Sequence, residues 1–123
     1  MDQYFDSKLV YFLEYPDFNR EGQFVHSLGG KKMVVMVGGS FCSHCKHTAP
    51  IFNDFAKKVK GDVVLAVIQV DGSDSERALG KLIGDMAQIR GIPSFLLFDE
   101  EGKYMKKHDG ERSVEGFLSF LAN

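Results

Sequence analysis

The sequence predicts an α/β fold with a central mixed β-sheet of four to five strands, flanked by helices on both faces. Runs of apolar, β-branched residues bounded by turn residues alternate with amphipathic stretches, in the order β-α-β-α-β-β-α. The 123 residues, 44% of them hydrophobic, suffice for one core, so we expect residues 1–123 to form a single domain. A net charge of −2 favours neither nucleic acid nor an anionic membrane as partner, and no apolar run approaches the roughly 20 residues that span a bilayer.

The first part of the chain combines a segment of mixed character with one clear strand. Residues 1–20 are expected to form an N-terminal extension or a first strand. Lys32 to Val37 is apolar, β-branched and bounded by glycines, which predicts a buried strand. Between them a short helix ending at Gly29-Gly30 is predicted from three apolar residues at helical spacing, namely Phe24, Val25 and Leu28.

Two helices and a second strand are predicted in the middle of the chain. A helix is expected from Cys42 to about Lys60, with Pro50 inside it, and a buried strand follows over Asp62 to Val70. The next helix is expected to have Asp74 or Ser75 as its N-cap. Its apolar positions are spaced i, i+3, i+4 and i+7: Leu79, Leu82, Ile83 and Met86.

A β-hairpin and a last helix complete the predicted order. Ser94 to Phe98 is a third strand, residues 99–102 form a turn, and Lys103 to His108 returns as an antiparallel fourth strand. The last helix starts at Ser113, and its inward positions are Val114, Phe117, Leu118 and Leu121. The antiparallel hairpin beside parallel βαβ connections makes the expected sheet mixed.

The only two cysteines, Cys42 and Cys45, lie three residues apart directly after the first buried strand. If a helix starts at Cys42, both sulfurs lie on one face of its first turn, close enough to bond. A helix N-terminus carries partial positive charge, which favours the reactive thiolate form of cysteine. This motif therefore predicts thiol–disulfide exchange, with the Cys42–Cys45 disulfide as the redox-active group and no further cofactor.

Four landmarks in order resemble the thioredoxin superfamily over roughly residues 30–122. They are the strand followed by Cys42-Ser43-His44-Cys45-Lys46, the helix residue Pro50, the segment Gly91-Ile92-Pro93-Ser94-Phe95-Leu96-Leu97-Phe98, and Gly110-Glu111-Arg112 before an amphipathic helix. The resemblance implies a thioredoxin fold and a protein disulfide oxidoreductase. His44 between the cysteines is similar to protein disulfide isomerase domains, so the resemblance leans toward an oxidant or isomerase.

Three residues depart from the family pattern. Phe41 stands where the family usually has Trp, so an aromatic side chain facing the substrate is kept without the indole N–H. Met36 stands where the family commonly has a buried Asp or Glu that is thought to relay the proton of the second cysteine. Ser43 replaces the usual Gly or Pro and is expected to change the stiffness of the motif.

The resemblance implies roles for the two sulfurs and for His44. Cys42 is the expected nucleophile, which attacks a partner disulfide, and Cys45 resolves the mixed disulfide. His44 lies next to both sulfurs and is expected to stabilise the thiolate, or else it is a histidine on an exposed turn.

Four further residues are implicated around the motif. Pro93 is expected to form a cis peptide bond near the sulfurs, with the Ile92 backbone pairing with an extended substrate peptide beside Phe41. Lys46 helps to hold the thiolate or is a solvated lysine of the first turn. Arg112 lowers the pKa of Cys45 during resolution, or it is a surface arginine near a helix start, which is the simpler interpretation.

Two other classes of function compete with the oxidoreductase. A metal site can draw on Cys42, His44, Cys45 and His47, but one helical turn does not easily place four ligands in a tetrahedron, and His26 and His108 have no paired spacing. Alternatively, the domain is a binding or adaptor module with weak turnover, which the missing carboxylate at Met36 favours.

Partners and location are expected from the chemistry and from the start of the sequence. The partners are protein thiols or disulfides and a reductase or oxidase that recycles the pair, and the protein is expected to be a monomer. The sequence opens without a basic segment followed by an apolar one, so a cytoplasmic location is the default expectation. A viral protein or a secretory protein trimmed of its leader are the alternatives, and the net direction of the reaction stays open.

Overall fold

The computed structural model describes residues 1–122 and contains one five-stranded mixed sheet with the order β1-β3-β2-β4-β5. Its strands are β1 (Val10–Phe12), β2 (Lys32–Gly38), β3 (Val63–Gln69), β4 (Ser94–Phe98) and β5 (Tyr104–Lys107). Strands β1, β3 and β2 run parallel, whereas β4 is antiparallel to β2 and to β5. The predicted mixed sheet is confirmed, and residues 1–20 supply its edge strand β1.

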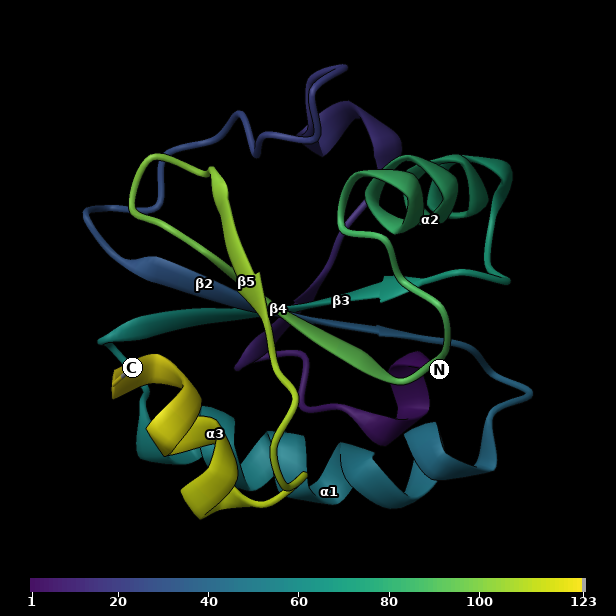
Figure 1. Ribbon diagram of the computed structural model, residues 1–123. Coiled ribbons are helices and arrows are strands. Elements are labelled where there is room, and N and C mark those ends of the chain that lie inside the picture. The colour runs from purple at the N-terminus through teal and green to yellow at the C-terminus, as the bar shows by residue number, and fades with distance from the viewer. Residues whose placement is uncertain (123) are drawn as a thin grey trace.

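Helices cover both faces of this sheet (Figure 1). The long helix α1 (Ser43–Lys58) and the last helix α3 (Val114–Ala122) pack together on one face, and α2 (Asp74–Met86) lies on the other. Two short 3-10 helices, η1 (Asp2–Tyr4) and η2 (Tyr15–Asp17), flank β1. No helix in the described part of the chain is long and apolar enough to cross a membrane.

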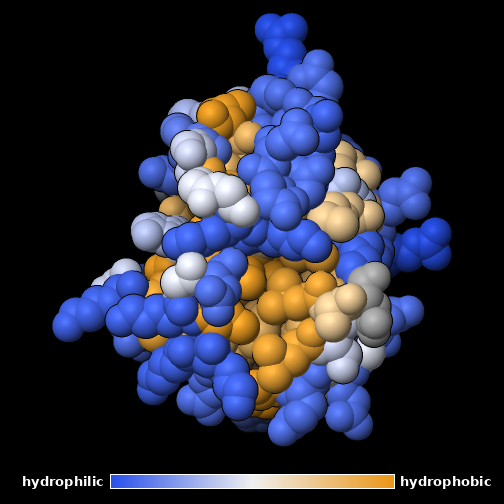
Figure 2. All heavy atoms as spheres, turned by 90° about the vertical axis from the view of Figure 1, so that its left-hand side faces the viewer, coloured by the Kyte–Doolittle hydropathy of each residue, from blue (hydrophilic) through white to orange (hydrophobic). Residues whose placement is uncertain are grey.

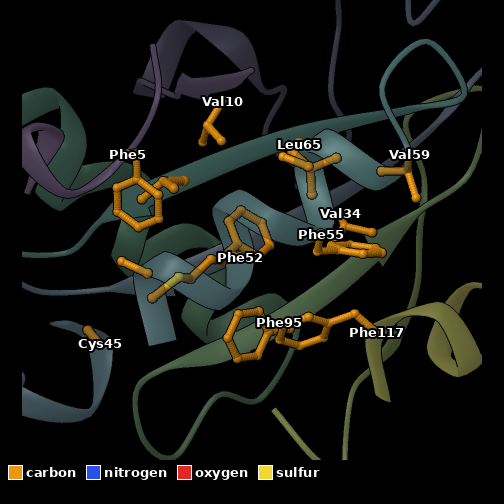
Figure 3. Close-up of a cluster of buried hydrophobic side chains, with 14 of the residues drawn as sticks. Phe5, Val10, Val34, Cys45, Phe52, Phe55, Val59, Leu65, Phe95 and Phe117 are labelled. Atoms are coloured by element: carbon orange, nitrogen blue, oxygen red, sulfur yellow. The ribbon is translucent and has the colours of Figure 1, made fainter. Parts of the chain in front are cut away.

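The core under α1 and α3 is built largely from phenylalanine rings. Phe95 and Phe117 have ring centroids 4.7 Å apart, and Phe52 lies 5.8 Å from Phe95 and 6.1 Å from Phe117 (Figure 3). Burying each ring stabilises the fold by about 1.5–3 kcal/mol relative to its exposed state. Both cysteines belong to this cluster: Cys45 is fully buried within it, and Cys42 has 8% of its surface exposed.

The second core, between the sheet and α2, has two features that differ from the sequence prediction. Residues 24–28 form no helix: the Phe24 N–H donates to the Gly102 carbonyl at 2.9 Å and the Val25 N–H donates to the Asp17 carbonyl at 2.9 Å. So short an apolar stretch cannot offset the cost of helix nucleation against these tertiary hydrogen bonds. The predicted N-cap of α2 was also wrong, because Ser73 caps the helix in place of Asp74 or Ser75.

Ser73 and Glu76 form a capping box at the start of α2. The Glu76 N–H donates to Ser73 Oγ at 3.2 Å, and the Ser73 N–H donates to Glu76 Oε1 at 3.0 Å. These reciprocal bonds satisfy two backbone donors at the helix start, which explains why Ser73 is preferred. The Ser-x-x-Glu pattern was visible in the sequence and is the signal that the prediction missed.

Figure 2 shows the end of the molecule that lies opposite the start of α1. Apolar atoms gather in the middle of this face and hydrophilic residues surround them. The cysteine motif lies at the other end, where β2 ends and α1 begins.

Candidate active site

Cys42 is the N-cap of α1, and its sulfur takes the place of the usual capping oxygen. The Cys45 N–H donates to Cys42 Sγ at 3.1 Å. The first N–H groups of a helix have no partner within the helix, and the helix dipole makes this end positive. The sulfur of Cys42 therefore lies where a thiolate accepts a charge-assisted hydrogen bond.

The two sulfurs differ in their access to solvent. Cys42 is 8% exposed, whereas Cys45 is fully buried, and both cysteines are free thiols. Burial raises the pKa of the Cys45 thiol to about 12, and the hydrogen bond with Cys42 adds to this rise. The positive charge of Arg112 acts in the opposite direction but is the weakest of the contributions. The arrangement makes Cys42 the accessible sulfur and keeps Cys45 protonated behind it.

The loop before β4 faces the cysteine motif. The Ile92–Pro93 peptide bond is cis, which confirms the sequence prediction. The Cys42 thiol lies 3.8 Å from the Ile92 carbonyl oxygen, and Arg112 Nη2 donates to the Pro93 carbonyl at 3.3 Å. The segment 110–112, distant in sequence, is thus tied to the loop beside the sulfurs.

Phe41 lies on the surface beside this loop. Its side chain is 72% exposed, which makes it the most exposed of the large apolar residues described. A Cβ added at Gly39 would lie 2.8 Å from the Phe41 ring and 3.3 Å from Ile92 Cδ1, so a larger residue at this position would force the exposed Phe41 ring to shift. Phe41 and Ile92 therefore form one apolar surface patch next to Cys42.

The remaining motif residues point away from the core. Ser43, His44 and Lys46 are exposed. The His44 carbonyl accepts a hydrogen bond from Thr48 Oγ1 at 2.8 Å, while its imidazole makes no hydrogen bond with any described residue. The structure thus brings His44 to the rim of the site without a fixed contact to either sulfur.

Met36 occupies an apolar position within the core that contains Cys45. Its side chain is fully buried among residues of that cluster. The groups that shift the pKa of Cys45 are Cys42, Gly39 and Arg112, with no carboxylate among the described residues that do so. The structure therefore offers no proton relay of the kind expected at this position in the family.

Sequence reasoning missed a clamp that holds the turn before Phe41. The Ser40 N–H donates to both carboxylate oxygens of Asp71, at 3.0 and 3.1 Å, and Ser40 Oγ also donates to Asp71. Burial alone would raise the pKa of Asp71, but the hydrogen bonds from Ser40 and Gln69 outweigh it and lower this pKa below its ordinary value. The signal in the sequence was an acidic residue at the carboxyl end of the strand next to β2.

Two histidines outside the motif, His26 and His108, have local partners. His26 Nε2 lies 2.8 Å from Asp17 Oδ1, and His108 Nε2 lies 2.7 Å from the Glu111 carbonyl oxygen. The His108 ring also lies 4.9 Å from the ring of Phe120. Among residues 1–122, no group of three or more His, Cys, Asp or Glu side chains is placed to hold a metal ion.

Comparison with known proteins supports the same family. The thioredoxin family model matches residues 18–123. A thioredoxin domain-containing protein of Theileria parva is 40% identical over 80 residues, which are 65% of this chain and 33% of that protein. The protein disulfide isomerase-like 2-1 of Oryza sativa subsp. japonica is 30% identical over 91 residues, which are 74% of this chain and 24% of the relative. The chain thus spans about a quarter to a third of the length of these curated relatives.

Solved structures show the same fold. The J-Trx1 fragment of ERdj5 superposes with a TM-score of 0.70 at 23% identity and covers 95% of this chain and 52% of its own. The Trx4 domain of ERdj5 superposes with a TM-score of 0.69 at 19% identity, over 93% of both chains. Together with the Cys-x-x-Cys helix start and the matching family model, these likenesses show that the chain belongs to the thioredoxin family, as a thioredoxin-fold domain related to protein disulfide isomerases.

Proposed function

We propose that this domain is a thiol–disulfide oxidoreductase that acts on protein disulfides through Cys42 and Cys45. The observation that carries the proposal is the Cys42 sulfur, which caps α1 at 3.1 Å from the Cys45 N–H and lies 3.8 Å from the Ile92 carbonyl. A capped thiolate beside an extended loop can attack a disulfide in a chain that pairs with that loop. The redox-active group is the cysteine pair itself, with no other cofactor.

The reaction proceeds in two exchanges. The Cys42 thiolate attacks one sulfur of a substrate disulfide, the substrate S–S bond breaks, and the leaving thiolate takes up a proton. The Cys45 thiolate then attacks the Cys42 sulfur of the mixed disulfide and releases the second substrate thiol. Two electrons and two protons pass from the cysteine pair to the substrate. When the oxidised pair donates its disulfide, the same steps occur in reverse.

The surroundings of Cys42 suggest the chemistry of substrate docking. Ile92 contributes a carbonyl near the sulfur, and no described residue accepts a hydrogen bond from its N–H. An extended substrate can pair with this backbone, a contact that depends little on side-chain identity. Phe41 and Ile92 then provide apolar area on one side of the substrate sulfur.

We further propose that His44 makes the Cys42–Cys45 pair a stronger oxidant, which favours oxidation or isomerisation of substrates. An imidazolium beside Cys42 stabilises the thiolate of the reduced form, and a more stable reduced form is a stronger oxidant when oxidised. His44 is exposed, and its imidazole makes no hydrogen bond with any described residue that would hold it away from Cys42. A reductase or an oxidase must recycle the pair, according to the direction in which the domain works.

Reduction of insulin and refolding of scrambled ribonuclease test the proposed activity. Wild-type protein should catalyse at least one of these reactions, and Cys42→Ser should abolish it. Trapping substrates with Cys45→Ser should freeze the mixed disulfide at Cys42. Equal turnover by wild type and Cys42→Ser would refute the proposed mechanism.

A second candidate is an adaptor that holds partners as long-lived mixed disulfides. The buried Cys45 thiol with its pKa of about 12, together with apolar Met36, favours this alternative because resolution requires the Cys45 thiolate. Slow release of a trapped partner by wild-type protein, with little turnover in either assay, would favour the adaptor over the oxidoreductase.

A further inference from the structure

A pocket beside the cis-proline loop concentrates positive charge next to the cysteine motif. It has a volume of about 340 Å³ and lies between residues 90–95 and residues 107–112. Arg90, Lys107 and Arg112 line it, and Asp109 is the one carboxylate among its described lining residues. We call this feature the cationic pocket. Its charge contrasts with the net charge of −2 of the whole chain.

The cations of this pocket are held in place without being neutralised. Lys107 Nζ donates to the Gln88 carbonyl at 3.0 Å, and Arg112 Nη2 donates to the Pro93 carbonyl at 3.3 Å. Both acceptors are uncharged, so the positive charges stay available to a ligand. Arg90 is exposed and makes no hydrogen bond or ion pair with any other described residue. The ion pairs found within residues 1–122 lie elsewhere in the molecule.

The cationic pocket shares its wall with the proposed substrate site. Ile92 and Pro93 line the pocket, and the Ile92 carbonyl is 3.8 Å from Cys42 Sγ. A substrate chain that pairs with Ile92 is extended, so successive side chains point to opposite sides and advance by about 3.3 Å per residue. A side chain two residues from the substrate cysteine then lies about 7 Å along the chain, within reach of a long arginine side chain.

We propose that the cationic pocket selects substrates that carry Asp or Glu within about three residues of the reactive cysteine. The inference rests on the proposed oxidoreductase function and adds a substrate class to it. Charges at the rim of an interface act mainly on the rate of association and on the choice among partners. Acidic flanks are attracted to Arg90 and Arg112, whereas basic flanks are repelled.

Three peptide disulfides of equal length test this preference, with acidic, amide and basic residues beside the same cysteine. The measured quantity is the second-order rate constant for reduction of each peptide by the prereduced protein. We expect the acidic peptide to react about threefold to tenfold faster than the amide peptide at low salt. High salt should remove the difference, because it screens exposed charges.

Arg90→Gln tests the pocket directly, since Arg90 has no structural partner within the described chain. This variant should lose most of the preference for the acidic peptide and keep the rate with the amide peptide. Arg20→Gln removes an equal charge from an exposed arginine that does not line the pocket, and it should retain the preference. Equal rates of the wild type with acidic and amide peptides would overturn the inference.

Two further outcomes separate this inference from the proposed function. Reaction with all three peptides at one rate would leave the oxidoreductase intact and refute the selectivity. If no peptide reacts, the double variant Cys42→Ser, Cys45→Ser is titrated with fluorescently labelled acidic and amide peptides. Tighter binding of the acidic peptide, lost in Arg90→Gln, would support the pocket, and equal binding would refute it.

Discussion

The buried thiol of Cys45 predicts a steep pH dependence for resolution of the mixed disulfide. Only a thiolate attacks a disulfide, and the pKa of Cys45 is about 12. At pH 7 about one Cys45 in 10⁵ is then ionised, compared with a few per cent for an ordinary cysteine with a pKa of about 8.5. Formation of the mixed disulfide removes the hydrogen bond and charge of Cys42, but burial, the largest cause, remains. The rate should therefore rise about tenfold per pH unit, or about a hundredfold from pH 7 to pH 9.

Release of a chromophoric thiol from Cys42 measures this step alone. In the wild type, a mixed disulfide between Cys42 and the chromophoric thiol is formed in the stopped-flow instrument, and release of the thiol is followed by absorbance. The control is the same mixed disulfide on Cys42 of the Cys45→Ser variant. The wild type should release the chromophore at a rate that depends on pH and not on protein concentration. The Cys45→Ser adduct should release none on this timescale.

The pH range of the experiment is set by the effect of Cys45 ionisation on the stability of the fold. The pKa of Cys45 in the folded protein is raised above its unfolded value of about 8.5, so its contribution to stability is complete below that pH. The contribution falls as the pH rises from about 9 toward 12, and circular dichroism should show an intact fold up to pH 9. A release rate that stays constant between pH 6 and pH 9 would refute the reasoning, because it would require a base that deprotonates Cys45.

Four further changes test other parts of the structure. His44→Gly should lower the reduction potential, measured against glutathione, by about 30 mV for each tenfold loss of thiolate stabilisation, and an unchanged potential would contradict the role of His44. Arg112→Gln should slow resolution and move its pH profile upward, whereas Arg112→Lys should restore both. Phe117→Ala should cost about 3–5 kcal/mol in denaturant unfolding, and a loss below 1 kcal/mol would contradict its place in the core. Asp71→Asn should cost about 1 kcal/mol by weakening the Ser40 clamp, and this difference from wild type should shrink as the pH falls below about 4 and vanish only below the lowered pKa of Asp71 in the folded protein.

Much of the fold was predictable because its elements carry strong local patterns. The strand β2 and the helix α1 meet at a glycine-rich turn, and the amphipathic spacing of α2 and α3 indicates which faces are buried. Residues 24–28 were predicted wrongly because their conformation depends on hydrogen bonds to Asp17 and Gly102. A short local pattern holds no information about such distant partners.

The candidate site was predictable in its residue types but not in its electrostatics. The Cys-x-x-Cys spacing and the cis-proline loop were found from the sequence, and the structure places them within 3.8 Å of each other. The clamp between Ser40 and Asp71 was not found, because 31 residues separate its members. The cationic pocket likewise joins Arg90 to Lys107 and Arg112, which only the folded chain brings together.

The two sulfurs at the start of α1 have different environments, and this difference connects the two candidate functions. Cys42 at the cap accepts a hydrogen bond from the Cys45 N–H, while burial keeps Cys45 protonated. Under the proposed mechanism each exchange requires its own thiolate, so we expect the first exchange to be faster than the second. Oxidoreductase and adaptor then differ only in how fast Cys45 loses its proton. With apolar Met36 at the family's usual carboxylate position, Arg112 is the one cation that lowers the pKa of Cys45, and its effect is the smallest of the contributions. We therefore expect Arg112 to adjust the rate of resolution, whereas burial of Cys45 sets its scale.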